Sequence, residues 1–70
     1  MRNTIKLDPK KLKLARLEKG YSIRKLEIKS NVSRPTIIRL EKGIGTAEEY
    51  TVFKLSKALG VSMEELQWKV

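Results

Sequence analysis

Apolar residues recur at helical spacing along most of the 70-residue chain, and residues typical of helix ends border each periodic stretch. Asp8 followed by Pro9 predicts the start of a first helix, with Leu12 and Ala15 facing inward, and Gly20 predicts its end. A basic amphipathic helix on a membrane surface has a similar pattern. The segment is short and another capped segment follows at once, which favours a packed first helix.

Two further helices are predicted close together in the middle of the chain. Ser22 is the expected cap of a helix over residues 23–30, and Asn31 tolerates the left-handed conformation that a tight turn requires. Val32 is expected to fill the core beneath that turn. With a third helix over residues 34–41, the two helices are joined by about three residues, which is the pattern of a helix-turn-helix.

The third segment, RPTIIRLE, has two different faces. Because a helix advances about 100° per residue, Ile37 and Leu40 point together toward the core. The opposite face presents Arg34, Pro35, Ile38 and Arg39. Proline is tolerated in the first turn and disfavours helical geometry in the residue before it, so the cap is Ser33 or Arg34, with Ser33 favoured.

Two more helices complete an all-α fold of five short helices. Thr46 and Glu49 have the spacing of a capping box for a fourth helix that reaches Leu59, and Ser62 with Glu65 repeats that spacing before a short last helix. The expected organisation is an N-terminal arm (residues 1–8), one helical domain (residues 9–66) and a C-terminal tail (residues 67–70). The arm is expected either to pair with the tail as a small sheet, which is favoured, or to reach toward a nucleic-acid groove.

Composition narrows the function. Sixteen Lys and Arg oppose eight Asp and Glu, and there is no His and no Cys. Residues 1–42 carry net +9 and residues 43–70 carry net −1, a distribution that suits a polyanion-binding face better than a uniformly solvated lysine-rich surface. Without the usual zinc ligands, general base or nucleophile pair, no metal, cofactor or enzymatic activity is expected. No apolar run approaches a membrane span and no signal-peptide core is present, so a cytoplasmic protein is expected.

The stretch LARLEKGYSIRKLEIKSNVSRPTIIRLEKG, followed by TVFKLSKALGVSMEEL, resembles the phage-repressor type of helix-turn-helix protein, the Cro/CI or XRE family. The resemblance covers roughly residues 10–66, and its most specific pieces are NVSRPTIIRLEKG and KLSKALGVS. It implies a compact lambda-repressor-like domain whose helix over residues 34–41 lies in the major groove of DNA.

The resemblance also implies residue roles. The positions that match base-contacting sites are Ser33, Arg34, Pro35, Ile38 and Arg39, although Ile38 suits a scaffold or dimer contact equally well. The positions that match phosphate-contacting sites are Ser22, Ile23 through its N–H, Thr36, Lys42 and Thr46. Arg16 and Glu41 match an ion pair that ties the first helix to the end of the third; the alternative is two separate surface charges.

This chain departs from the family pattern at three positions. Ile23 stands where relatives usually have glutamine, which puts a bracing contact to a base-contacting side chain in doubt. Glu27 stands where alanine is common, so its carboxylate must lean outward or pair with a cation, and Arg24 and Arg39 are the expected candidates. Asn31 replaces the usual turn glycine, which is chemically tolerable.

The resemblance implies a transcriptional regulator, expected to be a repressor, that binds double-stranded DNA as a homodimer on an inverted repeat, in a bacterium, an archaeon or a phage. The alternative is an interaction module of the same fold, such as an antitoxin that masks a toxin protein. The short tail after Leu66 argues against that alternative, although Trp68 and Val70 provide a small apolar patch for docking, for dimer contact or for covering the domain's own core.

Overall fold

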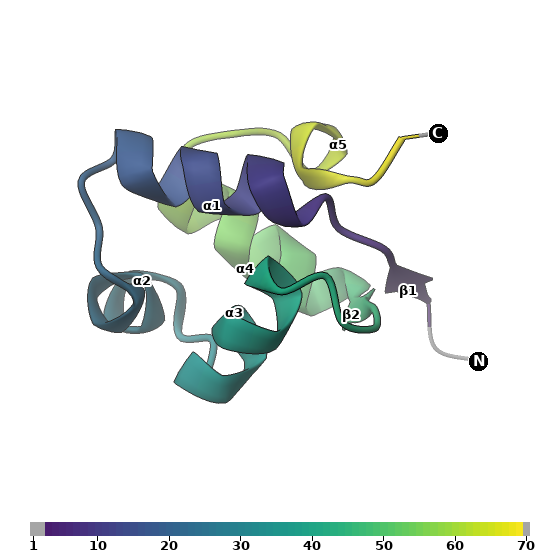
Figure 1. Ribbon diagram of the computed structural model, residues 1–70, viewed down its shortest axis with the longest axis horizontal. Coiled ribbons are helices and arrows are strands. Elements are labelled where there is room, and N and C mark those ends of the chain that lie inside the picture. Colours follow the sequence, from purple (N-terminus) through teal and green to yellow (C-terminus); the bar gives the residue numbers. More distant parts are fainter. Residues whose placement is uncertain (1–2, 70) are drawn as a thin grey trace.

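The computed structural model describes residues 3–69. Within that range the chain forms five helices and two short strands, in the order β1 (Thr4–Ile5), α1 (Pro9–Glu18), α2 (Ile23–Ser30), α3 (Arg34–Glu41), β2 (Ala47–Glu48), α4 (Glu49–Leu59) and α5 (Met63–Leu66). In Figure 1, α2 and α3 lie along the lower edge of the molecule, α1 and α4 lie above them, and α5 lies on the opposite side. The predicted five-helix domain is confirmed.

Capping residues set most helix ends as predicted. Asp8 accepts two main-chain N–H bonds in the first turn of α1, and Ser22 and Ser62 each accept one in the first turns of α2 and α5. These bonds satisfy N–H groups that have no acceptor inside the helix. Asn31 ends α2 with φ of +59°, which is the left-handed conformation expected of the turn.

The predicted capping box at the start of α4 is wrong. The helix begins at Glu49, and the cap position belongs to Glu48, whose side chain makes no capping bond. The preceding residues are extended because the N-terminal arm pairs with them: β1 and β2 are antiparallel, with Ile5 opposite Ala47. Ala47 is buried, so this small sheet anchors the loop that precedes α4.

The N-terminal arm also contacts the C-terminal tail, which confirms the favoured prediction in part. Leu7 forms an isolated antiparallel bridge with Gln67, and the main-chain N–H of Trp68 donates to the carbonyl of Lys6 at 2.9 Å. The sequence pattern gave no sign of the second partner, β2. The arm therefore runs between the tail and the loop after α3.

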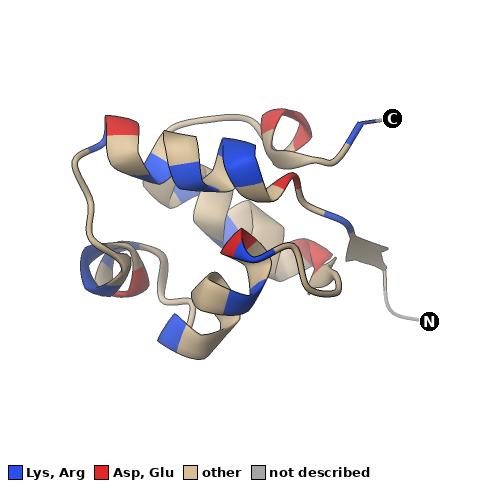
Figure 2. Ribbon diagram, in the orientation of Figure 1, with Lys and Arg blue, Asp and Glu red and all other residues tan. Residues whose placement is uncertain are grey.

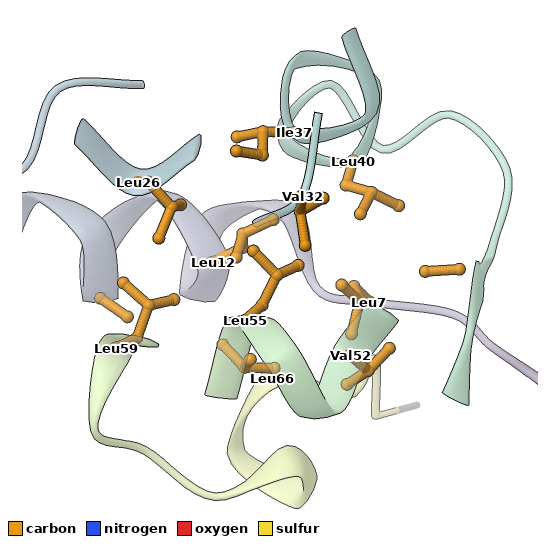
Figure 3. Packing of buried hydrophobic residues seen from close by; sticks show 12 residues of the cluster. Leu7, Leu12, Leu26, Val32, Ile37, Leu40, Val52, Leu55, Leu59 and Leu66 are labelled. Carbon is orange, nitrogen blue, oxygen red and sulfur yellow. The ribbon is translucent and has the colours of Figure 1, made fainter. Parts of the chain in front are cut away.

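One apolar core joins all five helices, and Figure 3 shows its side chains converging. Leu12, Leu26, Leu55 and Ile37 are fully buried, and Val32 fills the turn between α2 and α3 as predicted. Each such side chain contributes about 1.5–3 kcal/mol through burial. Because Ile37 and Leu40 of α3 both point into this core, the rotation of α3 about its own axis is fixed.

No helix within residues 3–69 combines the length and the apolar character needed to cross a membrane.

Candidate nucleic-acid interface

The outer face of α3 carries the side chains that the sequence analysis assigned to it. Arg34 and Pro35 are exposed, and Ile38 and Arg39 are half-buried. Ile37, on the opposite side, has no exposed surface. A helix anchored this way is held rigidly while its N-terminal turn stays accessible, as insertion into a groove requires.

The N-terminus of α3 is capped from the neighbouring helix. Ser33 occupies the cap position, as favoured from the sequence, but its hydroxyl bonds to the Thr36 hydroxyl at 2.9 Å and makes no capping bond to the main chain. The main-chain N–H of Arg34 instead donates to Oε2 of Glu27 at 2.9 Å. A carboxylate at this place also complements the positive end of the helix dipole.

The same carboxylate contacts the Arg34 side chain. Nε of Arg34 lies 3.8 Å from Oε1 of Glu27, with the two side chains 52% and 35% exposed. An exposed pair of this kind adds little stability, and it leaves the guanidinium beside the carboxylate at the start of α3. Arg24 and Arg39 were the expected partners of Glu27, and that expectation is wrong, because the start of α3 brings Arg34 beside the carboxylate and Arg39 bonds to the following loop.

Arg39 makes a different contact, with the loop after its own helix. Its Nη1 donates to the carbonyl of Ile44 at 2.8 Å and to the carbonyl of Thr46 at 3.0 Å. Gly45 lies between these two residues with φ of +73°. The N–H groups of Nη1 are therefore directed at protein carbonyls.

The residues expected at phosphates surround α3 at three places. Ser22 and Ile23 form the start of α2, where the Ser22 hydroxyl is engaged as a cap and Ile23 is half-buried against the core. Thr36 lies in the first turn of α3. Lys42 and Thr46 are exposed and follow the end of α3.

Arg16 and Glu41 form a buried ion pair. Nε and Nη2 of Arg16 donate to the two carboxylate oxygens of Glu41 at 2.7 and 3.0 Å, and both side chains are less than a tenth exposed. Nη1 of Arg16 donates to the carbonyl of Tyr21 at 2.8 Å. The hydrogen bond to Glu41 raises the pKa of Arg16 above its usual value, against the opposing effect of burial. The pair ties α1 to the end of α3 and to the segment before α2.

Basic residues are concentrated in the helices that surround the turn. Figure 2 shows Lys and Arg along α1, α2 and α3, while Asp and Glu positions lie mostly near helix ends. Most of the positive charge of residues 1–42 therefore lies in α1, α2 and α3, the three helices that include the helix-turn-helix pair.

Sequence reasoning missed two contacts at this site, and each had a signal. Glu27 stands where a small residue is common, so a carboxylate beside the start of α3 had to find a donor there. Gly45 is the second glycine of a short loop, and such a residue often marks a close approach by another group. The group that approaches it is the Arg39 guanidinium.

Comparisons with known proteins agree with this geometry. A helix-turn-helix family model matches residues 12–66. The restriction-modification controller protein C.AhdI from Aeromonas hydrophila is 26% identical; the match covers 81% of this chain and 86% of that one, with a TM-score of 0.76. SinR, a master regulator for biofilm formation solved in complex with DNA, is 30% identical, with 80% and 90% covered and a TM-score of 0.76.

A third structure supports the fold alone. The hypothetical transcription factor NHTF from Neisseria is 19% identical; the match covers 96% of this chain and 86% of that one, with a TM-score of 0.72. No curated protein sequence is significantly similar to this chain.

Proposed function

The chain belongs to the helix-turn-helix family of the XRE type, and we propose that it is a transcriptional regulator that binds specific double-stranded DNA sequences with α3 in the major groove. The observation that carries the proposal is the N-terminal turn of α3. There an arginine is half-exposed, lies beside a carboxylate of the neighbouring helix and stands on a helix packed into the core.

Arg34 is the residue proposed to set sequence preference. A guanidinium at the start of a recognition helix is placed to donate to O6 and N7 of one guanine, a contact worth about 1–3 kcal/mol of discrimination. Pro35 and Ile38 supply apolar surface for thymine methyl groups, and Ser33 supplies a hydroxyl beside them.

Phosphate contacts are proposed on both sides of this turn. The main-chain N–H of Ile23 is at the first position of α2, where no intrahelical acceptor exists, and helix starts of this kind bind phosphate oxygens. Ser22 and Thr36 add hydroxyl groups, and Lys42 and Thr46 follow the end of α3. These groups fix the register of the protein on the duplex without selecting a sequence.

Two copies are proposed to bind together, as repressors of this type do on an inverted repeat. A two-fold symmetric dimer presents its two recognition helices to successive major grooves about 34 Å apart, one turn of duplex. SinR and C.AhdI, which are regulators by description, support the regulatory role proposed here.

Titration of selected duplexes tests the proposal. Duplexes recovered from a random DNA pool are titrated at fixed salt with the wild-type protein and with Arg34→Ala, Lys42→Ala and Lys57→Ala, the last being an exposed lysine of α4 that serves as control. Arg34→Ala is expected to weaken binding by about 1–3 kcal/mol and to relax preference at one base pair. Lys42→Ala is expected to weaken binding to all sequences similarly. Equal, sequence-independent losses for Arg34→Ala and Lys42→Ala would contradict the assignment.

A further inference from the structure

We propose that Arg39 is a positioning residue, which holds the loop from Ile44 to Thr46 in the shape in which that loop meets the DNA backbone, and that it does not select bases. This inference rests on the proposed function, because it concerns how the same surface engages a duplex. It assigns the two arginines of α3 to different tasks.

Hydrogen-bond geometry supports this role. One nitrogen of the guanidinium, Nη1, bridges two carbonyl oxygens two residues apart, from Ile44 at 2.8 Å and from Thr46 at 3.0 Å. Both N–H bonds of Nη1 are thereby used. A cation that donates to two carbonyls of one loop closes that loop around itself, and charge-assisted bonds of this kind are among the stronger ones.

The close approach of Gly45 to the same nitrogen belongs to this arrangement. A Cβ atom built at this residue would lie 2.9 Å from Nη1 of Arg39, closer than such contacts occur in proteins. The loop backbone therefore passes against the end of the Arg39 side chain, so a side chain at residue 45 would displace the guanidinium from this position.

The contact also determines which loop groups remain for a ligand. In a planar trans peptide the C=O and the next N–H point in opposite directions. The carbonyl of Ile44 is turned toward Arg39, so the N–H of Gly45 points away from it. Without the cation, the two carbonyl oxygens could turn toward the phosphate backbone, and their partial negative charges would repel it. In this proposal Arg39 keeps the carbonyl oxygens of Ile44 and Thr46 turned toward itself and leaves the N–H of Gly45 free to face a phosphate.

Removal of the side chain separates this role from base contact. Arg39→Met is titrated with the selected duplex and with variants changed at single base pairs. A positioning role predicts a similar loss for every duplex, about 3- to 10-fold, equivalent to the one or two hydrogen bonds at stake. If Arg39 contacts a base, Arg39→Met would instead lose its preference at one base pair, and that result would overturn the proposal.

Two glycine substitutions separate the effect of loop shape from the effect of the Arg39 charge. Gly45→Ala leaves the Arg39 charge in place but displaces its guanidinium. Gly20→Ala is the matched control, because Gly20 has the same φ of +73° and a Cβ there meets no described atom within 4 Å. Gly45→Ala is expected to weaken all duplexes as Arg39→Met does, and Gly20→Ala is expected to leave affinity unchanged. If Gly45→Ala binds as tightly as Gly20→Ala, the loop shape is irrelevant and the proposal fails.

Amide spectra of the free protein test the contact without DNA. In Arg39→Met, amide exchange at residues 44–47 is expected to accelerate and their chemical shifts to move, while the amides of α1 stay as in the wild type. Unchanged loop amides would overturn the proposal. Should the wild-type protein bind no duplex, the proposed function fails, whereas these spectra still decide whether Arg39 shapes the loop.

Discussion

Loss of the buried ion pair between Arg16 and Glu41 is predicted to cost a large part of the stability of this domain. Arg16 makes three hydrogen bonds, two to Glu41 and one to the Tyr21 carbonyl, and both charged side chains are less than a tenth exposed. Arg16→Met leaves a buried carboxylate without its partner, which typically costs about 3–5 kcal/mol. The whole domain has only about 3.5–10 kcal/mol at the usual 0.05–0.15 kcal/mol per residue.

Urea denaturation followed by far-ultraviolet circular dichroism measures this cost, together with the slope that reports exposed surface. The double variant Arg16→Met/Glu41→Leu is expected to recover at least about 2 kcal/mol of the loss, because no charge is then left buried. Lys13→Met on the same helix is the control; this exposed lysine should change stability by less than about 0.5 kcal/mol.

The coupling free energy between positions 16 and 41 tests whether the two side chains stabilise the fold as a pair. A coupling free energy well above about 0.5 kcal/mol in the double-mutant cycle is expected for groups in direct contact. If Arg16→Met costs less than about 1 kcal/mol, or if the two substitutions are additive, the pair does not hold α1 to the end of α3 and the reasoning is refuted.

Three further predictions concern α2 and α3. Glu27→Gln keeps an acceptor for the main-chain N–H of Arg34 but removes the charge, so duplex titration should show weaker preference at the base pair that Arg34 contacts; unchanged preference would contradict this. Asn31→Gly should raise the free energy of unfolding in urea, by up to about 1 kcal/mol, because φ is +59° there; a loss of stability would contradict this. Ile37→Ala should cost about 2–5 kcal/mol in the same assay, whereas half-buried Ile38→Ala should cost clearly less and weaken DNA binding; equal costs would contradict the assigned faces.

The sequence was most informative where a local rule governs structure. Asp8, Ser22 and Ser62 cap their helices because a short polar side chain before a helix can accept a hydrogen bond from a main-chain N–H of the first turn. Ile37 and Leu40 face the core because helical spacing alone puts them on one side.

Contacts between segments far apart in the sequence were harder to predict. Thr46 and Glu49 have capping-box spacing, but pairing of the N-terminal arm with Ala47 and Glu48 makes this segment extended, and no local pattern contains that partner. The Arg39 contact depends on the path of the loop after α3. Gly43 and Gly45 both have positive φ in this loop, and the presence of two glycines does not by itself specify that path.

Paired selection from a random DNA pool, with wild-type protein and with Arg34→Ala at the same salt concentration, tests whether the exposed start of α3 selects a DNA sequence. Wild-type protein is expected to select an inverted repeat, with half-site centres about 10 base pairs apart. Arg34→Ala is expected to select the same repeat with preference lost at one symmetric position. Enrichment of no sequence by the wild type, or an identical motif for both proteins, would contradict the proposal.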